Sequence, residues 1–108
     1  MMSDELLAAE RALAFGMVDE AERLFRLAAA ADPTSSVAVV GLAGVALERG
    51  DQEGALVFAR QALALEPANE AASRLVTRLD EVLRYREATR SAAPAAASNA
   101  APRGAPKP

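Results

Sequence analysis

Hydrophobic positions recur at helical spacing along the first third of the chain. Intervals of three and four residues place such positions on one face of a helix. The first apolar stripe consists of Leu6, Leu7, Ala9 and Leu13, and the second of Ala21, Leu24, Phe25 and Ala28. Gly16 separates the two stripes, and Pro33 ends the second because a residue before proline disfavours helical geometry. The loop around Gly16 is so short that the two helices are predicted to lie antiparallel, as a helical hairpin.

The same plan follows from residue 34 to residue 67. Hydroxyl-bearing residues at 34–36 can cap a third helix, which we expect to run to a break at Gly50. Asp51 can cap a fourth helix, which is predicted to end at Pro67. The third helix is apolar nearly all round, as expected of an element that is flanked on several sides.

A fifth helix is predicted after Pro67. Asn69 can cap it, and we expect it to run to about residue 90. It has one apolar and one charged face, which is typical of a helix that closes a stack of repeats. The apolar face consists of Leu75, Val76, Leu79, Val82 and Leu83. Residues 91–108 are rich in alanine and proline without periodicity, so we predict a disordered tail there.

The two predicted hairpins are copies of one another. When the sequence is aligned with itself so that Gly16 coincides with Gly50, Pro33 coincides with Pro67, because both pairs have the same offset (50 − 16 = 34; 67 − 33 = 34). We call this offset the repeat period. Glycine and proline punctuate helices and are sparse here, so these matches carry more weight than the alanine matches. A period of this length indicates repeats of two short helices, each stacked on its neighbours.

These repeats resemble the tetratricopeptide repeat, a helical hairpin of the same period with small framework residues and a proline that closes its second helix. The resemblance is carried by Gly16, Ala21, Phe25, Ala28 and Pro33 in the first copy, and by Leu42, Ala43, Gly50, Ala55, Ala62 and Pro67 in the second. It implies an all-α fold in which antiparallel hairpins stack as a short right-handed solenoid of five helices. We therefore expect a repeat domain at 1–90, with repeat one at about 2–35, repeat two at about 36–69 and the capping helix at about 69–90.

The fourth helix departs from the family pattern. Ala59 stands where the family usually has a bulky aromatic residue, and the neighbouring Phe58 can compensate. Two repeats are also fewer than the three or so expected of a stable stack, which favours dimerisation or a partner that completes the stack.

Composition argues against several functional classes. The chain has 108 residues, a net charge of −3, and no cysteine or histidine, which removes thiol chemistry, disulfides, structural zinc and the usual general base. Adjacent acids such as Asp19 and Glu20 point about 100° apart on a helix and do not converge on a substrate. We predict no enzymatic activity, no cofactor and no metal site. The negative charge and the lack of a stacking aromatic surface argue against nucleic acid.

The sequence also bears on the expected location. Its acidic N-terminus is unlike a secretory signal, which would be basic. The longest apolar run, residues 37–47, is too short to cross a bilayer. We therefore expect a cytoplasmic protein with no membrane insertion.

The resemblance further implies a binding surface, because in this family the first helices of successive repeats line a concave groove that holds a peptide or a helix. The aligned positions are Leu6, Glu10, Leu13, Val37, Val40, Gly44 and Leu47, with Arg74 and Arg78 on the capping helix. The best-known members grip a C-terminal carboxylate with lysine and asparagine. This chain lacks these residues at the matching positions, so the resemblance implies an apolar trough without that clamp.

Two features of the trough allow alternatives. Gly41 and Gly44 each cost roughly 1 kcal/mol of helix propensity relative to alanine. Either they let neighbouring backbones approach, or Gly44 leaves the groove open for a ligand. Arg74 and Arg78 are i, i+4 neighbours that can reach one acidic group of a partner, or can pair with Glu70 or Glu81 as ordinary solvated charges.

The sequence therefore predicts a protein–protein interaction module, such as an adaptor, co-chaperone or assembly factor. Its partner would be a peptide or amphipathic helix of another protein, with an acidic group near the arginine pair. The alternative is a self-associating scaffold that forms a homodimer through the same apolar surface.

Overall fold

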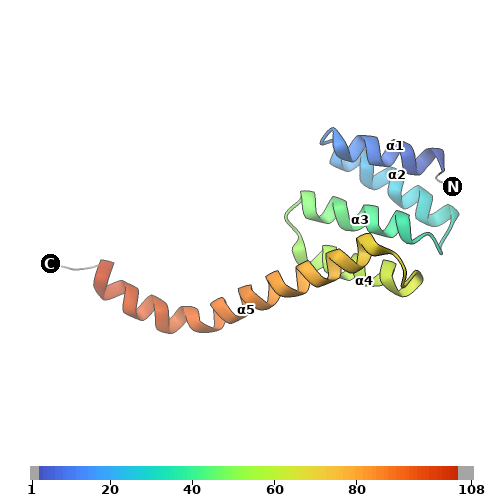
Figure 1. Cartoon of the computed structure of the whole chain (residues 1–108). Helices are drawn as coiled ribbons and strands as arrows, with labels where there is room; N and C mark the ends of the chain where they lie inside the picture. The colour runs from blue at the N-terminus through green and yellow to red at the C-terminus, as the bar shows by residue number, and fades with distance from the viewer. Residues whose placement is uncertain (1–2, 105–108) are drawn as a thin grey trace.

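The computed structural model describes the backbone of residues 3–104 and the side chains of residues 3–92. The described backbone is all-α, as predicted, and contains no strand (Figure 1). It forms five helices: α1 (Asp4–Ala14), α2 (Val18–Ala31), α3 (Ser36–Glu48), α4 (Gln52–Leu65) and α5 (Glu70–Gly104).

Side-chain caps start four of the helices. The hydroxyl of Ser3 accepts a hydrogen bond from the Leu6 amide at 3.2 Å, and Ser35 does the same for α3. The carboxylate of Asp51 caps α4, and the amide oxygen of Asn69 caps α5. Each cap satisfies an amide that would otherwise lack a partner in the first helical turn. The caps predicted for α3, α4 and α5 are therefore confirmed.

Two glycines make the tight turns within the hairpins. Gly16 and Gly50 have φ angles of 79° and 78°, a left-handed conformation that residues with a side chain rarely adopt. Each turn reverses the chain over three residues, so α1 lies against α2, and α3 against α4. The second hairpin stacks on the first through α3 and α2, and α5 covers α4 (Figure 1).

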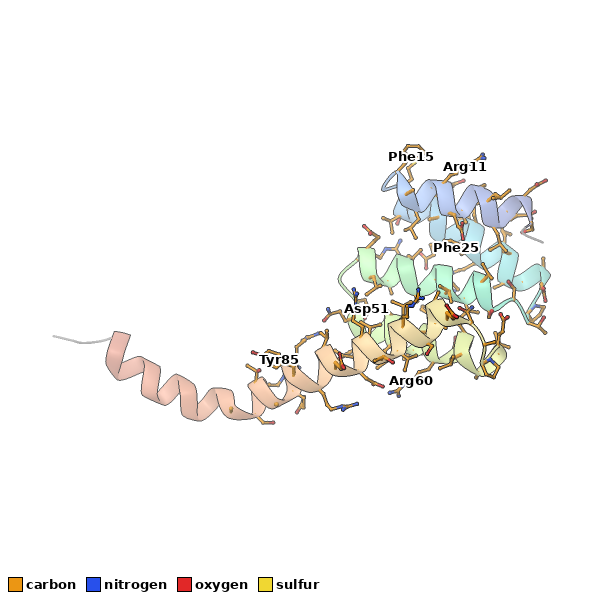
Figure 2. The ribbon with its side chains drawn as sticks, in the orientation of Figure 1. Arg11, Phe15, Phe25, Asp51, Arg60 and Tyr85 are labelled. Carbon is orange, nitrogen blue, oxygen red and sulfur yellow. The ribbon has the colours of Figure 1, made fainter. Side chains whose placement is uncertain are left out.

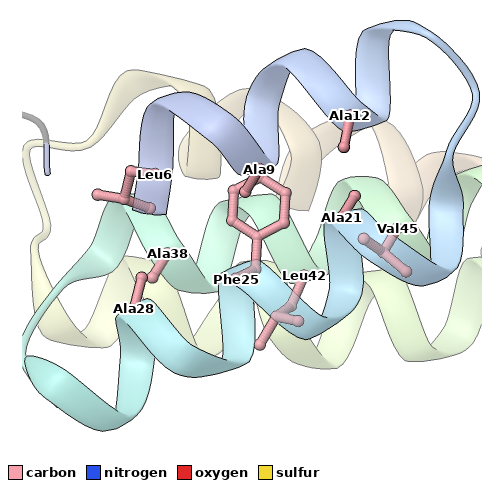
Figure 3. Packing of buried hydrophobic residues seen from close by; sticks show 9 residues of the cluster. All are labelled: Leu6, Ala9, Ala12, Ala21, Phe25, Ala28, Ala38, Leu42 and Val45. Atoms are coloured by element: carbon pink, nitrogen blue, oxygen red, sulfur yellow. The ribbon is translucent and has the colours of Figure 1, made fainter. Parts of the chain in front are cut away.

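The core between the hairpins consists mostly of small side chains. Phe25 is the largest fully buried residue, at 1% exposure, and lies among alanines and aliphatic residues of α1, α2 and α3 (Figure 3). In the second repeat Ala59 is completely buried, while the partly buried Phe58 packs against all three core clusters. Phe58 thus supplies the aromatic bulk that Ala59 lacks.

The fifth helix is longer than the sequence predicts. We expected it to end near residue 90, but in the structure α5 continues to Gly104 and leaves the other four helices, with a bend along its length (Figure 1). Alanine, the strongest helix former, is the commonest residue in this extension, whereas Pro94 removes one helical hydrogen bond. Residues 105–108 of the predicted tail lie outside the described residues. Of the helices described, none is both long and apolar enough to span a bilayer.

Candidate functional site

An open groove of about 680 Å³ lies on the face formed by α1, α3 and α5. These are the first helices of the two hairpins and the helix that follows them. Most of the residues that line the groove are apolar, and α3 supplies the largest share. They are Glu10, Leu13 and Ala14 of α1, Phe25 of α2, Val37, Val40, Gly41, Gly44, Leu47 and Glu48 of α3, and Asn69, Ala71 and Leu75 at the start of α5.

The two glycines of α3 shape the floor of this groove. A side chain at position 41 would overlap the ring of Phe25, so Gly41 allows α2 to approach α3 closely. A Cβ atom at position 44 would lie 3.0 Å from Cδ2 of Leu13, and Gly44 itself faces the groove. Both glycines thus fit the close-approach interpretation, Gly41 towards Phe25 and Gly44 towards Leu13, and both also line the groove.

The comparison with protein families agrees with this architecture. A family model described as tetratricopeptide repeat matches residues 12–79, from the C-terminal half of α1 into α5. The chain belongs to the tetratricopeptide repeat family. That family is a non-catalytic repeat that generally mediates protein–protein interaction. No curated protein and no solved structure matches the chain.

Six of the residues predicted from the tetratricopeptide repeat resemblance line the groove: Glu10, Leu13, Val37, Val40, Gly44 and Leu47. Leu6 lies elsewhere. It is 7% exposed and belongs to the core cluster around Phe25. Its side chain is therefore a packing element of the first hairpin rather than part of the groove surface.

The two predicted arginines of α5 also lie outside the groove lining. Nη2 of Arg74 lies 3.3 Å from Oε1 of Glu70, and both side chains are largely exposed. Arg78 is exposed and makes no ion pair within the described residues. Arg74 therefore matches the alternative in which it is an ordinary solvated charge paired with Glu70, whereas the pairing considered for Arg78 is not seen among the described residues.

The N-terminal end of α5 contributes groove residues that the sequence analysis missed. Asn69 caps α5, and its Nδ2 donates a hydrogen bond of 2.9 Å to the hydroxyl of the buried Ser36. Ala71 and Leu75 follow on α5. The repeat period could have found Ala71, because it lies one period after the predicted groove residue Val37 (71 − 37 = 34).

The charged side chains of the groove are both carboxylates. Glu10 and Glu48 are exposed, and neither makes an ion pair within the described residues. No arginine or lysine appears among the residues that line the groove. The groove therefore combines an apolar floor with uncompensated negative charge.

A separate ionic cluster joins the two repeats on α2 and the end of α3. Nη1 of Arg49 lies 2.7 Å from the carboxylate of Glu22, and Nη2 lies 2.5 Å from that of Asp19. Hydrogen bonds from Arg49 and then Arg26 lower the pKa of Glu22, against a smaller opposing effect of desolvation. The hydrogen bonds that Arg49 donates to Glu22 and then to Asp19 raise the pKa of Arg49. Among the described residues, no group of three or more acidic side chains could hold a metal ion.

Proposed function

We propose that this tetratricopeptide repeat chain is a non-enzymatic protein-interaction module whose groove binds the apolar face of an amphipathic helix from a partner protein. The observation that carries the proposal is the groove between α1, α3 and α5, with its mainly aliphatic lining. Val37 and Leu47 are 39% and 36% exposed, and both face this groove. Burying such side chains against an apolar partner contributes about 25 cal/mol per Å² of area removed from water.

The open shape of the groove suits a helix better than a small metabolite, which is usually largely enclosed by its pocket. The groove extends over three helices, and Ala14, Gly44 and Ala71 are small lining residues that leave room for a partner's side chains. An amphipathic helix presents anchors at i, i+3, i+4 and i+7, which can fill such a surface as helix-in-groove complexes do. An adaptor, a co-chaperone or an assembly factor would use this mode of binding.

The charge of the groove favours a basic partner over the acidic one expected from Arg74 and Arg78. Glu10 and Glu48 belong to the groove lining, whereas the two arginines do not. Lysine or arginine residues that flank the apolar face of a bound helix would lie near these carboxylates. Such complementarity contributes chiefly to specificity and to the association rate.

Two designed peptides test the proposal. Both have the same leucine-rich apolar helix face, and their flanking residues are lysine in one and glutamate in the other. We expect fluorescence anisotropy to show saturable binding of the lysine peptide to the full chain, with weaker binding of the glutamate peptide. Leu47→Glu should abolish this binding because it places a charge in the groove. Val57→Glu is the matched control, since Val57 is 57% exposed on α4 and does not line the groove.

The possible results separate the two parts of the proposal. If neither peptide binds, or if Val57→Glu weakens binding as much as Leu47→Glu, the groove is not the binding site. If the glutamate peptide binds more tightly than the lysine peptide, the groove assignment stands and the basic preference is wrong.

A further inference from the structure

The face of α1 that points away from the other helices carries two exposed apolar residues and two charges of opposite sign. Phe15 is 79% exposed and Leu7 is 42% exposed, and Ala8 lies between the charged residues Asp4 and Arg11. Figure 2 shows Arg11 and Phe15 projecting outward from α1. We call these five residues the outer face of α1. They are separate from the groove, which Glu10, Leu13 and Ala14 line from the same helix.

The equivalent residues in the second repeat show how this face is packed there. The positions one repeat period later are Ala38, Gly41, Leu42, Val45 and Arg49. All five serve the contact with α2 of the preceding hairpin: three are buried in the cluster around Phe25, Gly41 lies against the Phe25 ring, and Arg49 pairs with Asp19 and Glu22. In α3, therefore, the whole face is an interface between helices.

The third copy of this face is covered as well. Two repeat periods after the outer face of α1, the equivalent positions include Ala72 and Leu79 of α5, which are 0% and 2% exposed. They belong to core clusters that contain Ala62 and Ala55 of α4. Among the three equivalent helices, α1 is thus the one whose face has no covering helix within the described residues.

The charges of the outer face make it complementary to itself. Asp4 and Arg11 lie seven residues apart, two helical turns, and neither makes an ion pair within the described residues. In an antiparallel pair of α1 helices centred between Leu7 and Ala8, residue i faces residue 15 − i of the partner. Asp4 then faces the partner's Arg11, and Leu7 faces the partner's Ala8. A two-fold axis repeats each contact, as an isologous interface requires.

We propose that the outer face of α1 binds the same face of a second copy of this chain, in this antiparallel register. Leu7 and Ala8 lie at the centre of the contact, an ion pair between Asp4 and Arg11 lies on each side, and Phe15 lies at the edge, beyond the position that faces the start of the partner's helix. The interface is independent of the groove and leaves it open to another protein.

The contact is small, so the dimer should be weak. A standard protein interface buries about 800 Å² on each partner, and a single pair of 11-residue helices buries less. We expect a dissociation constant between about 10 μM and 1 mM.

Sedimentation equilibrium of the full chain, up to about 1 mM, tests the proposal. Leu7→Glu should weaken the dimer about tenfold or more, because it places a carboxylate in the apolar centre of the contact. Phe15→Glu should have a smaller effect, because position 15 lies at the edge. Asp4→Arg and Arg11→Asp should each weaken it about fivefold, since either change sets like charges opposite one another at both ends. The double variant with both changes should restore the original affinity.

Glu5→Arg is the matched control for the charge reversals. It reverses a charge in the same helical turn as Asp4→Arg, so its interaction with the helix dipole changes in the same way. Position 5, however, points about 100° away from position 4. Glu5→Arg should leave the dimer unchanged. Circular dichroism checks that every variant remains helical.

Three results would overturn the proposal. A chain that stays monomeric up to the highest concentration has no such interface. A dimer that Leu47→Glu breaks and Leu7→Glu leaves intact forms through the groove. If the double charge reversal does not restore a dimer weakened by the single reversals, the antiparallel register is wrong. The first and third results do not bear on whether the groove binds another protein, whereas a dimer that forms through the groove would compete with such a partner.

Discussion

The ring of Phe25 occupies the space that a side chain at position 41 would need. This pairing of a large residue on α2 with a glycine on α3 sets the approach of the first hairpin to the second (Figure 3). The positions one repeat period later are Ala59 on α4 and Leu75 on α5. The small residue is now on the second helix of the hairpin and the large one on the helix that follows. At this pair of equivalent positions the large and the small residue are therefore exchanged between the first interface and the second.

The first prediction compares the two glycines of α3. Gly41→Ala should destabilise the protein by about 1–2 kcal/mol, because overpacking against the fully buried Phe25 outweighs the gain of about 1 kcal/mol in helix propensity. Gly44→Ala should be neutral or stabilising by up to about 1 kcal/mol, since its nearest neighbour is the flexible end of Leu13. Urea unfolding followed by circular dichroism measures both. Equal stability of the two variants would show that the Phe25 ring can move aside.

The second prediction exchanges the two volumes. Phe25→Ala alone should cost about 3–5 kcal/mol by leaving a cavity, and Gly41→Leu alone should be strongly destabilising because its side chain has no space. The double variant reproduces the combination of Ala59 and Leu75 in the next interface. It should therefore be more stable than the sum of the single effects by at least about 1–3 kcal/mol. A strictly additive double variant would mean that the two interfaces are not interchangeable.

Local signals made most of the fold predictable from the sequence. Ser3, Asp51 and Asn69 cap their helices through contacts within three residues, and Gly16 and Gly50 turn the chain through their own φ angles. Such features depend on neighbours in the sequence, so the pattern of residues is enough to find them. The repeat period then fixes which helices are equivalent.

The groove was less predictable because its surface depends on tertiary packing. Leu6 belongs to the same apolar stripe as Leu13, yet packing against α2 and α3 buries Leu6 while Leu13 reaches the groove. On α5 the groove receives Ala71 and Leu75 rather than the aligned Arg74. Helical spacing identifies a broad apolar stripe, but it does not tell which edge of the stripe faces the core.

The third prediction concerns pH. Hydrogen bonds from Arg49 and Arg26 hold the pKa of Glu22 below its ordinary value of 4.5. The ionised carboxylate therefore stabilises the folded state above about pH 4.5, and this contribution is lost as the pH falls through the lowered pKa. The effect should be small, because the side chains of Glu22 and Arg49 remain 28% and 39% exposed.

Urea unfolding at several pH values measures this effect. The difference in midpoint between the native chain and Glu22→Gln should be largest near neutral pH and should shrink in acid. Glu81→Gln is the control, because Glu81 is exposed and makes no ion pair within the described residues. A difference for Glu22→Gln that does not change with pH would mean that the carboxylate acts through packing rather than charge.

The last prediction concerns the extension of α5. Beyond residue 90 the helix leaves the other helices, and a helical segment of this length is marginal in water without tertiary packing (Figure 1). Removing residues 91–108 should therefore leave the unfolding midpoint unchanged. By contrast, a chain that ends at Thr77 loses Leu79, which is 2% exposed, and should lose about 2–5 kcal/mol or more. Thermal unfolding of the two truncated chains measures both effects. A clear loss of stability in the 1–90 chain would show that residues 91–108 stabilise the repeats.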